Sequence, residues 1–217
     1  MSSKKLLFNL GAEMKKLKLV YLVLLTILIS TAAFSQNNNS LLPWFQPDSK
    51  LWLEGTSTFS DFTINAKEFM SSLIIESSVY ENNSKEEFKI SNLELIIPVW
   101  KLDSGDESMD ENMQEALLAE VNPNIVFELI SPVVFSFDNV IDSITINATG
   151  NLMVAGTKKL VDLNITVVKQ SENEFEFKGE IKLLMTDFGV EPPSMFFVTI
   201  NTGNEITVKF DMILNRK

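Results

Sequence analysis

The stretch Asn173–Met185 (NEFEFKGEIKLLM) alternates between apolar and polar side chains. Its apolar or small residues share one parity: Phe175, Phe177, Gly179, Ile181 and Leu183. The residues between them are all Glu or Lys. This period of two indicates a β-strand with one dry face and one wet face. Because such a strand needs a second apolar surface over its dry face, we expect a closed or stacked antiparallel β structure.

Many other segments carry the same alternation, and few helical patterns interrupt them. The predicted strands or their apolar runs include 50–58, 61–66, 73–80, 87–99, 125–129, 133–139, 144–154, 161–167, 195–200 and 206–214. The parity of the apolar residues changes between Ile90 and Leu93, which predicts a β-bulge. Thr202–Asn204 is predicted to form a tight turn, and Gly156–Lys159 another. The pattern favours an up-and-down barrel or a sandwich of about eight or more strands.

One helix is expected in this β-rich chain. Ser108–Glu111 fits a capping box at a helix N-terminus. Apolar residues follow at helical spacing from Met109 to Leu117, and Asn122-Pro123 ends the run.

Composition removes several classes of function. The chain has no Cys and no His, which excludes disulfides, thiolate or imidazole metal ligands and cysteine nucleophiles. The acidic run Asp103–Glu111 does not match an EF-hand loop, because Gly105 and Gln114 stand where ligands belong. No G-x-S-x-G elbow occurs. We therefore predict a protein that is not an enzyme, with no catalytic residues, no metal site and no cofactor.

The N-terminal residues 1–35 have the pattern of a signal peptide. Basic residues at 14–18 precede an apolar run at 19–29, and Ala33-Phe34-Ser35 gives small residues at −3 and −1, so cleavage is predicted between Ser35 and Gln36. A retained membrane anchor is the alternative, and Met14 is an alternative start. Residues 36–48 are predicted to be a linker and irregular arm, and residues 49–217 a single β domain.

The predicted mature chain is strongly acidic. Five of the 18 basic residues and one of the 29 acidic residues precede Gln36, which leaves 13 and 28, a net charge of −15. This charge repels phosphate backbones, so no nucleic-acid partner is expected. No stable membrane span is expected after cleavage.

The apolar strand faces permit two interpretations. They either fill a solid core or line a hollow that receives a hydrocarbon chain, whose burial is worth about 0.8 kcal/mol per CH₂. The alternating pattern does not separate these two interpretations.

Four motifs, in order from Ser49 to the C-terminus, resemble the YceI-like family. They are Ser49–Thr56, Met109–Phe127, Gly150–Leu163 with its turn Ala155–Lys159, and Met185–Val190 with the following Pro192-Pro193. The family consists of lipocalin-like barrels that bind polyisoprenoid lipids. The resemblance implies an all-β, extended eight-stranded antiparallel barrel with a lipid tunnel and one short inserted helix, exported commonly to the periplasm and without catalysis.

The leading hypothesis is an exported, non-enzymatic protein, periplasmic or secreted, that carries or sequesters an isoprenoid or other long-chain lipid. The residues predicted to line the lipid tunnel are Leu51, Leu53, Phe127, Leu129, Ile144, Ile146, Phe175, Phe177, Ile181, Leu183 and Phe210. The alternative is a structural or interaction barrel with a filled core that acts through its acidic surface. A carboxylate-based hydrolase is a third hypothesis, which needs two converging carboxyl groups. The sequence leaves the oligomeric state open, a dimer included.

Overall fold

Strands make up most of the described chain. The computed structural model describes residues 44–58, 60–80, 85–137, 142–195 and 200–215, so the predicted signal peptide and most of the predicted linker lie outside it. In chain order the elements are β1 (Trp44–Phe45), β2 (Lys50–Ser57), β3 (Asp61–Ala66), β4 (Met70–Tyr80), β5 (Lys85–Pro98), the 3₁₀ turn η1 (Val99–Lys101), β6 (Leu102–Asp103), helix α2 (Glu107–Ala116), β7 (Asn124–Leu129), β8 (Val133–Phe137), β9 (Ser143–Val154), β10 (Thr157–Lys169), β11 (Glu174–Leu184), the 3₁₀ turn η2 (Met185–Phe188), β12 (Ser194–Met195) and β13 (Ile200–Asn215). No helix in the described ranges has both the length and the apolar character to cross a bilayer.

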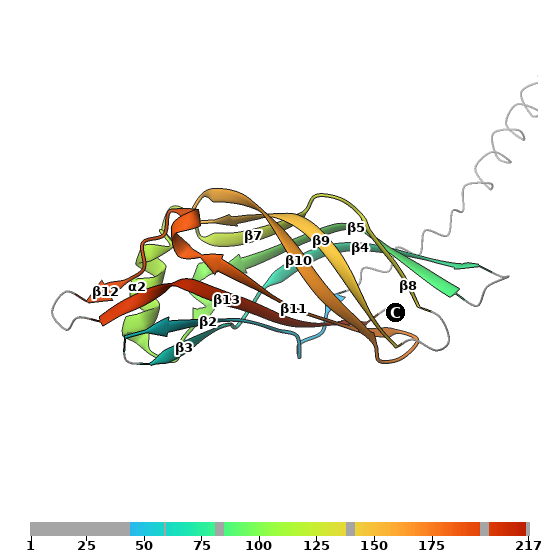
Figure 1. Ribbon diagram of the computed structural model, residues 1–217, viewed down its shortest axis with the longest axis horizontal. Coiled ribbons are helices and arrows are strands. Elements are labelled where there is room, and N and C mark those ends of the chain that lie inside the picture. The colour runs from blue at the N-terminus through green and yellow to red at the C-terminus, as the bar shows by residue number, and fades with distance from the viewer. Residues whose placement is uncertain (1–43, 59, 81–84, 138–141, 196–199, 216–217) are drawn as a thin grey trace, which may run out of the picture. The chain divides into compact units, whose positions relative to one another are not determined.

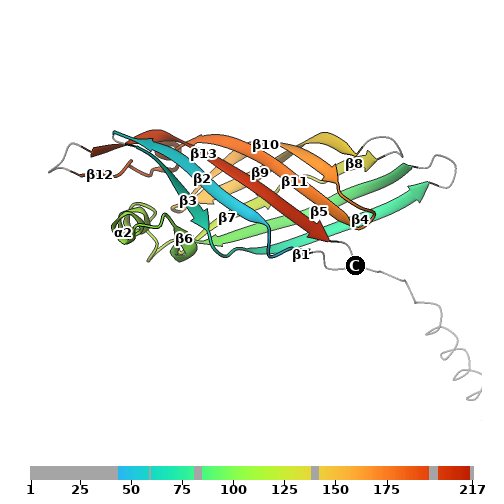
Figure 2. The same ribbon diagram turned by 90° about the horizontal axis from the view of Figure 1, so that it is seen from below.

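The strands form one antiparallel sheet that curls into a half-barrel (Figures 1 and 2). The order is β4-β5-β7-β9-β10-β11-β13-β2-β3-β6, with β8 also paired to β5, and β1 and β12 to β13. The predicted all-β, barrel-like fold with one short helix is therefore confirmed. The expected closure is not seen in the described ladder, which ends at β4 on one side and at β3 and β6 on the other.

The number of strands differs from the predicted eight, because the sheet formed by the described residues has thirteen. Part of the excess comes from two-residue pieces, namely β1, β6 and β12. Another part comes from β7 and β8, which pair with successive halves of the long strand β5. Pro132 lies in the interruption between them, where its missing N–H removes a ladder donor.

The predicted bulge in β5 is confirmed. Ile75 pairs with Ile90, whereas Ile74 pairs with Asn92, so Ser91 is the extra residue. The insertion lets the buried Ile90 and the cavity-side Leu93 face the same side of the sheet although three positions separate them.

The hairpin between β9 and β10 turns at Ala155-Gly156, which both have positive φ (47° and 78°). Positive φ at both central residues is the signature of a type I′ turn. The predicted turn at Gly156–Lys159 is therefore displaced, since β10 already begins at Thr157.

The predicted tight turn at Thr202–Asn204 is wrong. Strand β13 runs through these residues, and a register shift against β2 lies between Thr202 and Ile206. A Cβ at Gly203 would lie 2.5 Å from Oγ1 of Thr56. The glycine therefore marks a close approach of two strands rather than a change of chain direction.

Helix α2 exists as predicted, but Asp106 caps it instead of Ser108. The Asp106 carboxylate accepts a hydrogen bond from the backbone N–H of Met109 at 2.9 Å. On the inner side, Met113 of α2 packs in one cluster with Ile64, Ile97 and Leu102. This contact attaches the helix to β3, β5 and β6, next to the open side of the sheet (Figure 2).

A second cluster of buried residues fills the opposite end of the half-barrel. Phe88, Phe135, Phe137 and Phe175, here called the Phe cluster, are each 5% exposed or less. The centroids of the Phe88 and Phe175 rings are 4.8 Å apart in an edge-to-face arrangement, and those of Phe88 and Phe135 are 5.3 Å apart and stacked. Such contacts add to the stabilisation from burial alone.

The short strand β1 extends the sheet beside β13. The N–H of Gln46 donates to the carbonyl of Ile213 at 2.7 Å, and the ring of Phe45 contacts that of Phe69. This part of the predicted irregular arm is therefore strand-like.

Candidate functional site: an apolar cavity in the half-barrel

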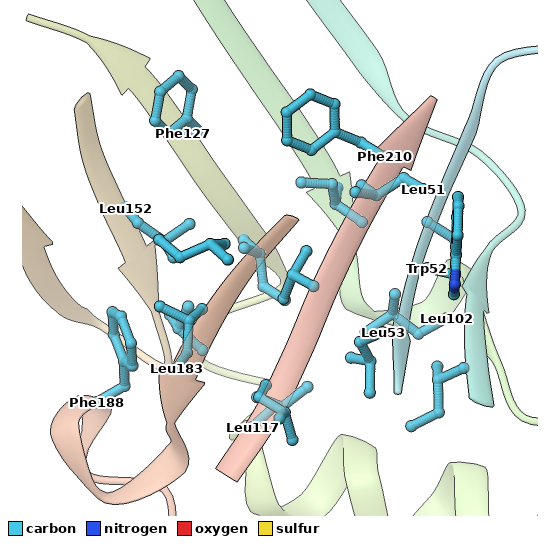
Figure 3. A pocket seen from close by; sticks show the side chains of 18 of the residues that line it. Leu51, Trp52, Leu53, Leu102, Leu117, Phe127, Leu152, Leu183, Phe188 and Phe210 are labelled. Atoms are coloured by element: carbon cyan, nitrogen blue, oxygen red, sulfur yellow. The ribbon is translucent and has the colours of Figure 1, made fainter. Parts of the chain in front are cut away.

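The concave side of the sheet encloses a cavity of about 1030 Å³. This lies at the upper end of the range for small-molecule sites. Figure 3 shows side chains from β2, β7, β9, β11 and β13 around a common space, among them Leu53, Phe127 and Leu183. Because side chains alternate along a strand, the lining residues of strands such as β10 and β11 are mostly two positions apart. The lining is predominantly aliphatic and aromatic.

The Phe cluster limits the cavity at one end. None of its four members lines the cavity, whereas the neighbouring Phe177, whose ring centroid is 6.2 Å from that of Phe135, does. The interior is thus packed solid around β8 and hollow nearer α2. The apolar strand faces therefore fill a core in one part of the half-barrel and line a cavity in another.

All but two of the residues predicted to bind lipid line this cavity. The predicted residues that do line it are Leu51, Leu53, Phe127, Leu129, Ile146, Phe177, Ile181, Leu183 and Phe210. Ile144 and Phe175 instead pack in the solid part of the core, where Phe175 is 1% exposed. Their parity gave the correct face, but parity says nothing about the position along the barrel axis at which side chains close the space.

Other lining residues were not named from the sequence. Val161, Leu163, Ile165, Ile206 and Val208 continue alternating runs that the sequence shows clearly, so their parity identifies them. Met109 and Met113 follow the helical spacing of α2. The buried Phe188 and Val190 come from η2 and the loop after it, where no periodicity marks them.

Three aromatic rings of the cavity wall lie against glycines. A Cβ at Gly55 would lie 2.3 Å from the ring of Phe62, and one at Gly150 would lie 2.3 Å from the ring of Phe127. The same holds at 2.5 Å for Gly179 and Phe210. The missing side chains give each ring room to lie along the wall, which leaves space in the middle.

Polar residues gather where the cavity meets solvent, at the α2 end. They are Ser57 and Ser60 from the β2–β3 connection, Asp106, Ser108, Asn112 and Glu115 from α2 and its cap, Glu191 from the loop after η2, and Thr202 from β13. We call these residues the mouth. Asp106, Ser108, Asn112, Glu115 and Glu191 are all exposed.

Charged residues on the outer face of the sheet form a separate group around Lys178. Its Nζ lies 2.8 Å from Oε1 of Glu176 and 3.5 Å from Oδ2 of Asp211. The hydrogen bond from Lys178 is the main reason why the pKa of Glu176 is lowered. Burial, followed by the neighbouring Glu176, raises the pKa of Asp211, whose Oδ1 is buried without a hydrogen-bond partner in the described residues.

No metal centre is visible in the part of the chain that the structure describes. Its Asp and Glu side chains form no group of three or more that could hold a metal ion. The strands instead form a cavity with a predominantly apolar wall and a polar opening.

Solved structures share this fold at low sequence identity. BcnA of Burkholderia cenocepacia has a TM-score of 0.56 at 16% identity, over 76% of this chain and 95% of BcnA. A polyisoprenoid-binding domain from Saccharophagus degradans, implicated in plant cell wall breakdown, has a TM-score of 0.58 at 10% identity, over 81% of this chain and 99% of that domain. The YceI protein of Campylobacter jejuni has a TM-score of 0.52 at 15% identity, over 74% of this chain and 88% of that protein.

None of the curated protein sequences matches the chain. The family model of the YceI-like domain, by contrast, matches residues 53–214, which include the cavity-lining strands from Leu53 onward. The chain therefore belongs to the family of YceI-like domains.

Proposed function

We propose that this protein is an exported, non-enzymatic binding protein that carries or sequesters a long apolar chain, a polyisoprenoid or a similar lipid, in the cavity of its half-barrel. The observation that carries the proposal is the cavity of about 1030 Å³ with a predominantly apolar wall. The structural alternative requires a solid interior throughout, whereas the described residues leave this cavity between the Phe cluster and the α2 end.

The energetics of such a site depend on burial. Each CH₂ group transferred from water to the cavity contributes about 0.8 kcal/mol, so a chain of twenty carbons gains enough to bind tightly with few polar contacts. Part of this gain offsets the lost freedom of the chain and the protein. Branched isoprenoid units match a wall made of Leu, Ile, Val and Phe, which has no fixed hydrogen-bonding pattern along its length.

The comparisons support the same ligand class. The similar domain from Saccharophagus degradans is described as polyisoprenoid-binding, and the family match covers the strands that build the cavity. Export is inferred from the predicted signal peptide, residues 1–35 with cleavage between Ser35 and Gln36. A periplasmic or secreted carrier follows from these two inferences together.

The first test is to extract the purified protein with organic solvent and to identify bound lipids by mass spectrometry. We expect a long-chain lipid at a substantial fraction of one molecule per protein. Purification should avoid detergent, since detergent chains compete for the same wall.

A matched pair of variants ties binding to the cavity. Ala148 is buried and lines the cavity, whereas its neighbour Asn147 is exposed. Ala148→Phe adds a ring to the hollow and should reduce the lipid recovered, while Asn147→Phe adds the same ring outside and should leave recovery unchanged. Absence of lipid from the parent protein, together with no binding of added isoprenoid alcohols, would contradict the proposal.

A further inference from the structure

The polar part of the cavity lining is acidic and contains no cationic side chain. Among the described residues that line the cavity, the charged ones are Asp106, Glu115 and Glu191, and neither Lys nor Arg is present. The remaining polar residues of the mouth are hydroxyl or amide side chains, which both donate and accept hydrogen bonds. An anion at this position would meet carboxylates and no opposite charge.

Several lysines adjacent in sequence to lining residues are already paired with carboxylates. Lys67, next to Ala66, lies 2.8 Å from Asp103. Lys101, next to Leu102, lies 2.8 Å from Glu68. Lys182, beside Leu183, lies 3.1 Å from Glu205. These pairs are exposed and contribute little to stability, but they partly cancel the positive charge that an anionic ligand would need.

Among the described lysines, strand register directs Lys159 and Lys169 to the concave face of the sheet, since directly paired residues of antiparallel strands share a face. Lys169 pairs with Phe175 of the Phe cluster and lies 3.6 Å from Glu86, whereas Lys159 pairs with Leu152. Leu152 lines the cavity, whereas Lys159 is exposed and does not line it. Lys159 is thus the candidate that an anionic head group would use.

We propose that the cavity selects chains with an uncharged polar end, such as a long-chain alcohol, and discriminates against chains that end in a phosphate, diphosphate or carboxylate. This inference rests on the proposed function, because it specifies the polar end of the lipid that the cavity holds. The net charge of −11 for the whole chain adds a long-range repulsion of the same sign.

The chemistry of the mouth fits a neutral head group. A hydroxyl donates a hydrogen bond to a carboxylate such as Glu115 or Glu191 and accepts one from Ser60 or Asn112. A phosphate at neutral pH only accepts, so carboxylates in the mouth repel it and offer it no donor. A low dielectric next to the apolar wall strengthens this repulsion.

Two probes with the same hydrocarbon chain test the proposal, namely farnesol and farnesyl diphosphate. Dissociation constants are measured by displacement of a fluorescent fatty alcohol at about 0.02 M and about 0.5 M salt. At low salt we expect farnesol to bind at least about tenfold more tightly than farnesyl diphosphate, since each like-charge contact weakens binding of the diphosphate. The difference should shrink at high salt, because screening weakens the repulsion and leaves burial of the chain unchanged.

Charge-reversal variants locate the effect. Glu191→Lys and Glu115→Lys should each strengthen binding of farnesyl diphosphate several-fold, whereas farnesol binding should not become stronger, because the alcohol loses one hydrogen-bond acceptor. Glu172→Lys is the matched control, because it changes the net charge equally but lies in the β10–β11 connection, away from the cavity lining. Thermal melts establish that each variant is folded.

The outcomes separate this inference from the proposed function. Equal or tighter binding of farnesyl diphosphate, lost on Lys159→Gln, would overturn the neutral-head inference and leave lipid carriage intact. An equal response to Glu172→Lys and Glu191→Lys would also overturn it, since net charge and not the mouth would then be responsible. If neither probe binds, the proposed function fails and the inference fails with it.

Discussion

At the scale of single residues, the group around Lys178 shows how the pKa values of two carboxylates on one sheet face are shifted in opposite directions. Glu176 accepts hydrogen bonds from Lys178 and from Nε2 of Gln170 at 2.9 Å, so its ionised form is favoured. The side chain of Asp211 is 29% exposed, and burial and the negative Glu176 disfavour its ionised form. The two groups therefore affect stability with opposite signs as the pH changes.

We predict that Asp211→Asn raises the free energy of unfolding at pH 7, by less than about 1 kcal/mol. The ionised Asp211 costs stability above its raised folded pKa, and the amide removes this cost and can donate to Glu176. As the pH falls towards and below the unfolded value of 3.8, the wild-type Asp211 takes up a proton and the gain disappears. Urea unfolding at several pH values between 7 and 3.5 measures the difference.

Glu176→Gln is the matched variant with the opposite sign. The pKa of Glu176 is lowered in the folded protein, so its charge contributes stability above the unfolded value of 4.5. That contribution is lost as the pH falls through the lowered folded pKa. Glu176→Gln should therefore destabilise at pH 7 and approach the wild type in acid. Two variants that shift stability in the same direction would contradict this account.

The sequence identified the face of these residues but not their environment. Strict alternation places Glu176 and Lys178 on the wet face of their strand. The side chain of Glu176 is nevertheless only 14% exposed, and its strand lies between β10 and β13, where Val168 and Ile213 pair with it. The partner of a strand is a long-range property, and no local pattern specifies it.

At the scale of elements, the Gly–Phe pairs join neighbouring strands around the cavity. Gly55 of β2 pairs directly with Phe62 of β3, and the three nearest atoms to a Cβ on Gly55 all belong to the Phe62 ring. The ring therefore packs on bare backbone, a known way for an aromatic residue to cover a glycine in a sheet.

We predict that Gly55→Ala destabilises the protein by about 1–3 kcal/mol, because the added methyl overlaps the Phe62 ring and drives it from its position. In a Phe62→Leu background the same substitution should cost far less, since the smaller side chain leaves room for the methyl. Denaturant unfolding of the four proteins gives the coupling energy. A cost of Gly55→Ala that is unchanged in the Phe62→Leu background would show that the ring is not the cause.

Much of the element structure could be predicted because period-two patterns are local. The parity change in β5 revealed the bulge at Ser91 without any structural knowledge. The prediction of a turn at Thr202–Asn204 was wrong because a glycine occurs both in tight turns and where two strands approach closely. The presence of Gly203 in the sequence does not distinguish these two situations. The hollow itself could not be predicted, since Phe175 and Phe177 have the same parity while only Phe177 lines the cavity.

At the scale of the whole molecule, excess negative charge opposes compaction. The chain carries 29 acidic and 18 basic residues. Several lysines are in ion pairs across strands, for instance Lys209 with Glu54 at 2.7 Å, but the carboxylates outnumber them. The folded state brings these charges closer together than the unfolded chain does.

We predict that the melting temperature rises when the NaCl concentration increases from about 0.01 M to about 0.2 M, because the screening length falls from about 30 Å to less than 10 Å. Differential scanning calorimetry at pH 7 measures the change. Sucrose at matched osmolarity serves as a control for solvent effects that do not involve charge. A melting temperature that falls over this salt range would mean that attractive ion pairs outweigh the net repulsion.

The packed Phe cluster has a consequence for how a ligand would enter and leave the cavity. In the proposed carrier, the Phe cluster blocks one end of the cavity, so the tail of a guest points towards this cluster, enters first and leaves last. Its polar tip stays beside α2 throughout, where Asn112 and Glu115 lie. In the proposed carrier, any protein that delivers or receives the lipid therefore has to approach the mouth. The position of the Phe cluster along the cavity sets the longest tail that can be fully buried.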